Sequence, residues 1–388
     1  MGLSNLTAMR ILHTSDWHLG RSLHRVDLLG AQAAHLDHLV EVVRAEGVDA
    51  VVVSGDVYDR ALPPLEAVHL LDDALDRLVD AAAAVLVISG NHDSATRLGF
   101  GSRRSAKAGL HLRTHPEQLD QPVQLADEHG PVMLYGIPYL EPALVCEPWQ
   151  VARSHAAVLG AAMRRIRADL DGHPGARSVV AAHAFVVGGQ GCDSERDIRV
   201  GGVDTAPARI FDGIDYVALG HLHGRQRISP TIRYSGSPLP YSFSEAGHVK
   251  GSWLVDLDAG GVRDVTEVPA PVFRRLSVLR GTLDQLLTDP AHAAAEQHIC
   301  QVTLTDEQRP RDAMQRIRAR FPDTVSLAFD SPAHTTKPAS HVVAAAAGTD
   351  LDLCCSFLRH VREHEESAAE RELLGEALEQ VRIRYASA

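Results

Sequence analysis

Five short segments of the chain carry side chains that could bind metal ions. Each segment directly follows a short apolar run and contributes carboxylate, carboxamide or imidazole groups. A donor set of oxygens and imidazoles without a thiolate favours Mn²⁺, admits Fe²⁺ and Zn²⁺, and suits Mg²⁺ less well. The candidate ligands are Asp16, His18, Asp56, Asn91, His183, His221 and His223.

These donors are more numerous than one tetrahedral ion requires. They suit two ions about 3.5–4 Å apart that share a bridging carboxylate, which is the geometry of two-metal phosphate chemistry. Asp16 and His18 are two positions apart, and such residues on an extended segment point to the same side, so both should reach one ion. The same spacing makes the same prediction for His221 and His223.

Alternating strands and helices are expected to position these side chains. Helical spacing of apolar residues predicts helices over residues 31–46 and 65–81. Alternation of this kind predicts an α/β layered domain over residues 1–268, with the ligands at the edge where strand ends converge. Apolar runs bounded by glycine predict buried strands over residues 10–13, 50–53, 85–88, 132–135, 178–182 and 216–219.

The pattern changes after residue 269 and predicts a small α+β domain over residues 272–330. Strands are expected at 273–279, 298–304 and 324–329, and Pro310 is expected to start a helix that ends at residue 320. Thr282 and Gln285 form a capping-box pattern at the start of another helix. Residues 331–350 are expected to be a linker.

Residues 351–388 are expected to form one or two C-terminal helices. Their apolar positions fit a helix that binds a coiled-coil or helical partner, although packing on the chain's own domain is the alternative. The two apolar patches consist of Leu353, Phe357 and Val361, and of Leu374, Leu378 and Val381.

Composition excludes several classes of protein. The hydrophobic fraction is 45% and the longest strongly apolar run is far shorter than a membrane span, so we expect a protein that is not in a membrane. The first ten residues lack the apolar core of a secretory signal, and the cysteines show no paired metal spacing, which favours a cytoplasmic protein with reduced thiols. A net charge of −12 argues against a uniformly basic nucleic-acid coat.

The ordered motifs Asp-x-His, Gly-Asp, Gly-Asn-His-Asp, His and Gly-His-x-His resemble the calcineurin-like metallophosphoesterase superfamily. Longer stretches are similar to the SbcD-type nuclease subunits of bacterial SbcC–SbcD DNA-repair complexes. These stretches are His13-Thr-Ser-Asp-Trp-His-Leu-Gly-Arg21, Gly55-Asp-Val-Tyr-Asp-Arg60, Ser194-Glu-Arg-Asp-Ile198 and Tyr234-Ser-Gly-Ser-Pro238. The resemblance implies a sandwich of layered β-sheets flanked by helices, followed by a small α+β capping domain and partner-binding C-terminal helices.

The resemblance also implies a role for each candidate residue. Asp56 would bridge two ions, and His92 would be the catalytic histidine that contacts the scissile phosphate or protonates the leaving oxygen. Asp59 and Asp93 would orient neighbouring groups. The first ion would be held by Asp16, His18, Asp56 and His223, and the second by Asp56, Asn91, His183 and His221.

The implied activity is hydrolysis of DNA phosphodiester bonds with Mn²⁺. It comprises 3′-to-5′ exonuclease action on duplex ends and endonuclease action on single strands and hairpins, in DNA repair, recombination and replication with an SbcC-type ATPase. The implied assembly is a homodimer within a heterotetramer that associates with the nucleoid when bound to DNA. The alternatives are a metallophosphoesterase for cyclic nucleotides, other small substrates or phosphoproteins, and a non-catalytic scaffold that binds DNA ends.

Arginines near the motifs could bind DNA despite the acidic net charge. If they gather at the rim of the site, they would contact phosphates without reading base sequence. The alternative is that they are scattered, solvated charges. The candidates are Arg21, Arg25, Arg60, Arg97, Arg103, Arg104 and Arg225, together with Lys107 and Arg227.

Overall fold

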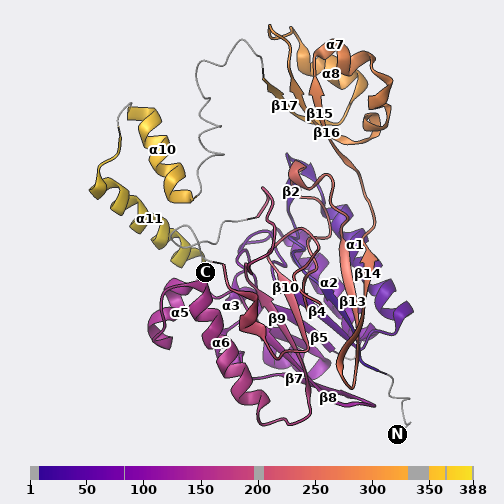
Figure 1. Cartoon of the computed structure of the whole chain (residues 1–388). Coiled ribbons are helices and arrows are strands. Elements are labelled where there is room, and N and C mark those ends of the chain that lie inside the picture. Colours follow the sequence, from indigo (N-terminus) through magenta and orange to yellow (C-terminus); the bar gives the residue numbers. More distant parts are fainter. Residues whose placement is uncertain (1–7, 83, 196–204, 331–348, 363–364, 387–388) are drawn as a thin grey trace.

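The structure, a computed structural model, describes residues 8–82, 84–195, 205–330, 349–362 and 365–386 (Figure 1). Two six-stranded sheets form the larger part of the described chain. The first has the order β14-β13-β1-β4-β5-β6, in which the bounds are Gly261–Pro269, Gly251–Asp258, Arg10–Thr14, Ala50–Ser54, Ala84–Ile88 and Leu110–Arg113. The second has the order β11-β12-β10-β9-β8-β7, with bounds Gln226–Arg227, Ile232–Tyr234, Tyr216–Gly220, Arg177–His183, Gly130–Ile137 and Val123–Asp127.

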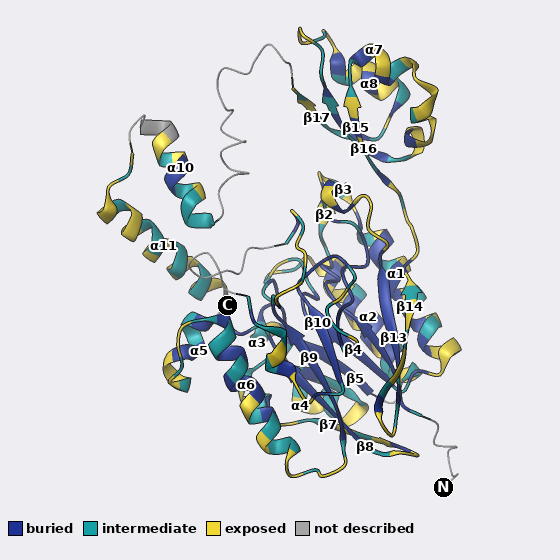
Figure 2. Ribbon diagram, viewed as in Figure 1, coloured by how far each residue is buried: buried dark blue, intermediate teal, exposed yellow. Residues whose placement is uncertain are grey.

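The two sheets pack face to face because successive strand residues point to opposite sides. Ile11 and Val52 of the first sheet lie in one buried cluster with Val179 and Ala218 of the second. The outer face of the first sheet packs on α1 (Leu29–Glu46) and α2 (Leu65–Ala81), and that of the second on α6 (His155–Leu170). Figure 1 shows the helices on both sides of the sheets, and Figure 2 shows the strands between them as buried. The predicted layered α/β sandwich is confirmed.

A smaller domain follows, but the α+β class predicted for it is wrong, because its strands are parallel and alternate with helices, as in an α/β unit. Its parallel strands β15 (Leu276–Gly281), β16 (Ile299–Leu304) and β17 (Thr324–Phe329) pack on α7 (Leu283–Thr288) and α8 (Ala313–Arg320). The Thr282–Gln285 capping box is formed.

Two predicted boundaries in this domain are wrong. The first strand begins at Leu276 rather than 273, and Phe273 is 53% exposed and lines a cavity between the domain and the sandwich. The helix predicted from Pro310 begins at Ala313, because Asp312 has a φ of 51°, outside the helical range.

This domain meets the sandwich through a shared apolar cluster and a cavity of about 370 Å³. Leu276 and Ile299 pack with Leu28 and Leu239 of the sandwich. The cavity is also lined by Glu245 and Lys250, which lie close to the candidate metal ligands.

Two C-terminal helices follow, α10 (Asp350–Arg362) and α11 (Ala368–Ala386). Leu353 and Phe357 are exposed, whereas α11 contacts the short helix α5 (Pro142–Trp149) and Glu379 pairs with Arg153. The helices thus combine a contact to the sandwich with exposed apolar side chains. The side chain of Val361 and most of the predicted linker, residues 331–348, lie outside the described residues. None of the described helices is long and apolar enough to cross a bilayer.

A buried histidine in α1 makes the fold sensitive to acid. His35 is 2% exposed, and neither ring nitrogen has a hydrogen-bond partner among the described residues. Burial lowers the pKa of His35 to about 3. His35 of the unfolded chain binds a proton near pH 6.5, whereas His35 of the folded chain stays neutral until about pH 3. The free energy of unfolding therefore falls as the pH drops from 6.5 towards 3.

Replacing His35 with leucine is expected to reduce this loss by up to about 1.4 kcal/mol per pH unit below about 6.5. Chemical denaturation of the metal-free protein at pH 5 and pH 8 measures it. The control is His69→Leu on α2, because His69 is exposed. Equal pH dependence in the wild-type protein and the His35 variant would contradict the prediction.

Candidate metal centre

The candidate ligands meet at the carboxyl ends of β1, β4, β5, β9 and β10. The loops that carry them are joined by backbone hydrogen bonds, since Asp16 N donates to Gly55 O at 3.0 Å and His18 N to Asp56 O at 3.0 Å. His183 is the last residue of β9, and His221 directly follows β10. Segments 205 residues apart in the sequence are thereby placed side by side.

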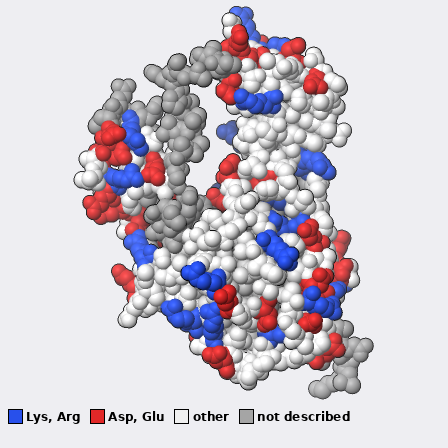
Figure 3. Space-filling model, in the orientation of Figure 1, with Lys and Arg blue, Asp and Glu red and all other residues white. Residues whose placement is uncertain are grey.

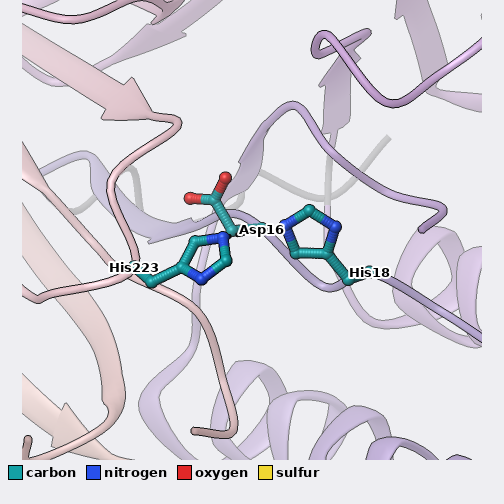
Figure 4. A group of neighbouring side chains, drawn as sticks. All are labelled: Asp16, His18 and His223. Atoms are coloured by element: carbon teal, nitrogen blue, oxygen red, sulfur yellow. Dashed lines mark hydrogen bonds between the residues drawn. The ribbon is translucent and has the colours of Figure 1, made fainter. Parts of the chain in front are cut away.

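Asp16, His18 and His223 form one side of the centre. The Nε2 atoms of the two histidines lie 2.9 Å apart, and the three residues offer ligand atoms within 4.8 Å of one another. Figure 4 shows the two imidazoles facing each other with the Asp16 carboxylate beside them. All three side chains are buried.

Asn91, His183 and His221 form the other side. Asn91 Oδ1 lies 2.9 Å from His183 Nε2 and 3.2 Å from His221 Nδ1. His183 Nδ1 lies 2.9 Å from the carbonyl oxygen of Ser54, and because a carbonyl can only accept, Nδ1 carries the proton and Nε2 presents its lone pair. His221 N donates to Asp16 Oδ1 at 3.0 Å, which links the two sides.

Asp56 lies between the two sides. Its Oδ2 atom is 3.6 Å from His18 Nε2 and 3.5 Å from His183 Nε2, and its Oδ1 accepts a hydrogen bond from His92 N at 2.8 Å. A Cβ at Gly90 would lie 2.1 Å from Asp56 Oδ1, so only glycine leaves room for this carboxylate.

His92 is placed differently from the other histidines. Its Nδ1 lies 2.7 Å from the carbonyl oxygen of Asp59, and its Nε2 is 4.0 Å from Asp56 Oδ2. Its ring also makes an edge contact with His18, with centroids 4.6 Å apart. Donation from Nδ1 to the carbonyl fixes the ring so that Nε2 faces the centre.

The two remaining acidic candidates support the loops. Asp93 accepts hydrogen bonds from the backbone N–H groups of Val57, Tyr58 and Gly90. Burial and the Asp56 charge raise the pKa of Asp93 to about 6. Asp59 places its carboxylate 3.9 Å from His18 Nδ1.

The extended geometry assumed for the Asp-x-His pair is wrong. Asp16, His18 and Asp56 have φ values of 53°, 46° and 49°, and His221 has 105°. These left-handed conformations are strained for residues with a Cβ and turn each ligand towards the centre. His221 and His223 accordingly point to different sides of the centre rather than to one position.

Burial sets the protonation of the ligands. It raises the pKa of Asp16 well above its usual range, reinforced by the nearby Asp56 charge. It lowers the pKa values of His183 and His223 to about 4. The imidazoles of these two residues are therefore neutral at neutral pH and can offer lone pairs. Neutral imidazoles beside buried carboxylates are the donors that divalent cations take, so the candidate residues fit such ions.

Several neighbours of the centre were not predicted. Ser194 and Glu245 lie behind His223, with Ser194 Oγ 2.6 Å from His223 Nδ1. Burial alone would raise the pKa of Glu245, but the contacts with His223 and Lys250 hold it below its usual range. Ser194 stands in a motif quoted above, whereas nothing in the spacing of Glu245 indicated its place. Residues 196–198 of that motif lie outside the described residues.

Cys192 also lies near His223, although the spacing of the cysteines in the sequence did not indicate it. Its backbone N–H and its Sγ both contact the Glu195 carboxylate, and Glu195 also accepts from His223 N. Burial raises the pKa of the Cys192 thiol to about 12, so it remains a protonated thiol at neutral pH.

Two of the predicted DNA-binding arginines form contacts within the protein. The Arg225 side chain is 6% exposed, pairs with Glu267 and stacks on Trp253. Arg21 donates to Ser194 O at 2.7 Å and lies over the Tyr241 ring. Their predicted phosphate contacts are therefore not supported. The exposed candidates are Arg25, Arg60, Arg97, Arg103, Arg104, Lys107 and Arg227. Figure 3 shows basic and acidic groups interspersed on one face of the molecule.

Two solved structures are similar to this chain at low sequence identity. The protein TT1561 of Thermus thermophilus is 14% identical, with a TM-score of 0.40, over 68% of this chain and 99% of that chain. A dimetal phosphatase from Danio rerio is 15% identical, with a TM-score of 0.40, over 68% of this chain and 99% of that chain.

Two families match successive parts of the sequence. The calcineurin-like phosphoesterase family matches residues 9–225, which is more than half of the chain. The SbcD_C family, described as the type 5 capsule protein repressor C-terminal domain, matches residues 272–362. The chain therefore belongs to the calcineurin-like phosphoesterase family, and the second domain identifies it within that superfamily as an SbcD-type subunit.

Proposed function

We propose that this metal-dependent phosphoesterase is a DNA nuclease. It would degrade duplex DNA from its 3′ ends and cut single strands and hairpins, together with an SbcC-type ATPase. The family match supports phosphoester hydrolysis by divalent metal ions, and the SbcD_C match supports DNA as the substrate class and the ATPase as partner. Mn²⁺ is the proposed ion because the donors at the centre are oxygens and imidazoles.

The position of Asp56 is the observation that carries the proposal. Its Oδ2 lies within 3.6 Å of ligand nitrogens on both sides of the centre, as a bridging carboxylate would. Asp16, His18 and His223 would complete the first ion's ligands. Asn91, His183 and His221 would complete the second ion's.

The residues divide the work of hydrolysis. Divalent ions held by these residues would supply positive charge for the phosphoryl oxygens and would lower the pKa of a water molecule that attacks in line. The buried ligands hold these charges in a fixed arrangement, which avoids reorganisation during reaction. His92, fixed through Asp59 O, presents Nε2 towards the space beside Asp56, where it can contact the phosphate or give a proton to the leaving oxygen.

One assay distinguishes the nuclease from its alternatives. The purified full chain with Mn²⁺ is given linear duplex DNA, single-stranded DNA, a cyclic nucleotide, a phosphopeptide and a chromogenic phosphodiester. Cleavage of DNA at a much higher kcat/KM than the cyclic nucleotide supports the proposal. A preference for the cyclic nucleotide or phosphopeptide would indicate a different esterase, and DNA binding without turnover of any substrate would indicate a scaffold.

Removing the C-terminal helices is expected to abolish binding of the SbcC-type ATPase. Leu353 and Phe357 are exposed by 41% and 64%, which leaves an apolar surface for a helical partner. A chain truncated after residue 350 should lose co-purification with the ATPase of the same organism. Retained Mn²⁺-dependent cleavage of single-stranded DNA is the control for folding. Undiminished co-purification would refute the assignment. The homodimer within a heterotetramer stays a prediction.

A further inference from the structure

A buried chain of hydrogen bonds leads away from the ring of His223. His223 Nδ1 lies 2.6 Å from Ser194 Oγ, and Ser194 Oγ donates a hydrogen bond to Glu245 Oε1. All three residues are less than 9% exposed. His223 Nε2, on the other side of the ring, faces His18 Nε2 at 2.9 Å.

The direction of these hydrogen bonds follows from the groups involved. An ionised carboxylate only accepts, and a serine hydroxyl has a single proton to donate. Because that proton points to Glu245, Ser194 Oγ must accept from His223 Nδ1–H. In a neutral imidazole the other nitrogen then carries a lone pair. His223 Nε2 is thereby held in the form that can bind a metal ion.

Further contacts hold this chain in place. Lys250 Nζ donates to Glu245 Oε2 and, at 2.8 Å, to the carbonyl oxygen of His223. Tyr241 N donates to Glu245 Oε1 at 3.1 Å. Glu245 is 1% exposed, so its charge is compensated within the protein rather than by bulk water. Arg21 restrains the serine segment through Ser194 O.

We propose that Ser194 and Glu245 are positioning residues that set the tautomer of His223 and thereby the metal affinity of the Asp16, His18 and His223 side. The inference rests on the proposed metal centre. Groups that accept a hydrogen bond from a ligating histidine typically change metal affinity about 10- to 100-fold when removed. The opposite side of the centre, with Asn91 and His183, lacks this chain and should be unaffected.

The most direct variant is Glu245→Gln. Lys250, as a cation, would attract the amide oxygen more strongly than the Tyr241 N–H does, which leaves the amide NH₂ facing Ser194. Ser194 would then accept from the amide and donate to His223 Nδ1, which moves the ring proton to Nε2. Ser194→Ala removes the acceptor altogether. Ser194→Thr keeps the hydroxyl and is the matched control.

Mn²⁺ alone is titrated into the full-length, metal-free protein by calorimetry and electron paramagnetic resonance. Glu245→Gln and Ser194→Ala should weaken one class of Mn²⁺ sites about 10- to 100-fold and leave the other unchanged. Ser194→Thr should remain near the wild-type affinity. In the metal-free protein, ¹⁵N spectra of histidine rings should show His223 protonated at Nδ1 in the wild type and at Nε2 in Glu245→Gln.

The variant His223→Gln separates the two proposals. If it leaves both classes of Mn²⁺ sites intact, the proposed metal centre is wrong at this residue. If it weakens one class while Ser194→Ala and Glu245→Gln do not, only the positioning role is wrong. Equal weakening of both classes with a lower Tm would indicate a structural role, which also overturns the inference. Should Glu245→Gln fail to fold, Ser194→Ala decides the question.

Discussion

Replacing Asp56 with asparagine is expected to lower Mn²⁺-dependent phosphodiester cleavage by about 1,000-fold or more. Asp56 Oδ2 is close to nitrogens of candidate ligands on both sides of the centre, so one substitution should weaken the binding of both proposed ions. The amide also lacks the negative charge that would compensate two dications. A loss of this size corresponds to about 4 kcal/mol of transition-state stabilisation. Steady-state cleavage of a labelled DNA and Mn²⁺ titration measure the two effects.

The fold should survive this change. Asp56 is 1% exposed, and burying an ionised carboxylate is costly, so the neutral amide should leave metal-free stability unchanged or higher. Asp73→Asn on α2 is the control, because its side chain is 61% exposed and pairs with Arg77 on the same helix. Activity within tenfold of the wild type in Asp56→Asn would contradict a bridging role.

The candidate ligands could be recognised in the sequence because each follows a strand. Parallel strands of an α/β layer present their carboxyl ends at a shared edge, so residues after different strands converge without any local signal connecting them. His183, for example, ends β9, and its Nε2 lies 2.9 Å from Asn91 Oδ1, which follows β5. Strand prediction therefore brought the candidate ligands together as well as predicting the fold.

The local conformation of those ligands could not be predicted in the same way. Asp-x-His spacing suggested an extended segment, but Asp16 and His18 adopt positive φ values that propensity disfavours. Hydrogen bonds to the loop after β4 stabilise these turns, and such bonds depend on tertiary contacts. The same limit applies to Glu245, whose role depends on a contact with Ser194 across 51 positions of sequence.

The positions of arginines in the sequence predicted DNA contacts less well than residue type predicted candidate metal ligands. An arginine near a motif can form ion pairs and stacking contacts inside the protein instead of binding a phosphate. Arg225 illustrates this, because its guanidinium pairs with Glu267 of β14 and stacks on Trp253 of β13. Burial of a long side chain along an apolar surface leaves no periodic pattern in the sequence. Predictions of DNA contacts therefore require the exposure that only a structure provides.

Replacing His92 with alanine is expected to slow DNA cleavage by about 100- to 10,000-fold while Mn²⁺ binding is retained. His92 Nε2 is 4.0 Å from Asp56 Oδ2, and its Nδ1 lies 2.7 Å from Asp59 O. The imidazole is thus fixed beside Asp56, where we expect it to contact substrate rather than to hold an ion. Calorimetric Mn²⁺ titration tests whether metal binding is retained, and single-turnover cleavage of DNA tests whether the reaction is slower.

The leaving group shows which of its two candidate roles His92 performs. A sugar 3′ oxygen needs a proton as it departs, whereas a nitrophenolate does not. If His92 donates that proton, His92→Ala should slow cleavage of DNA far more than cleavage of a nitrophenyl phosphodiester. If it stabilises the phosphoryl group, both substrates should slow equally. If His92→Ala cleaves both substrates at wild-type rates, His92 has no role in the reaction. If the variant binds one Mn²⁺ fewer, His92 is a metal ligand instead.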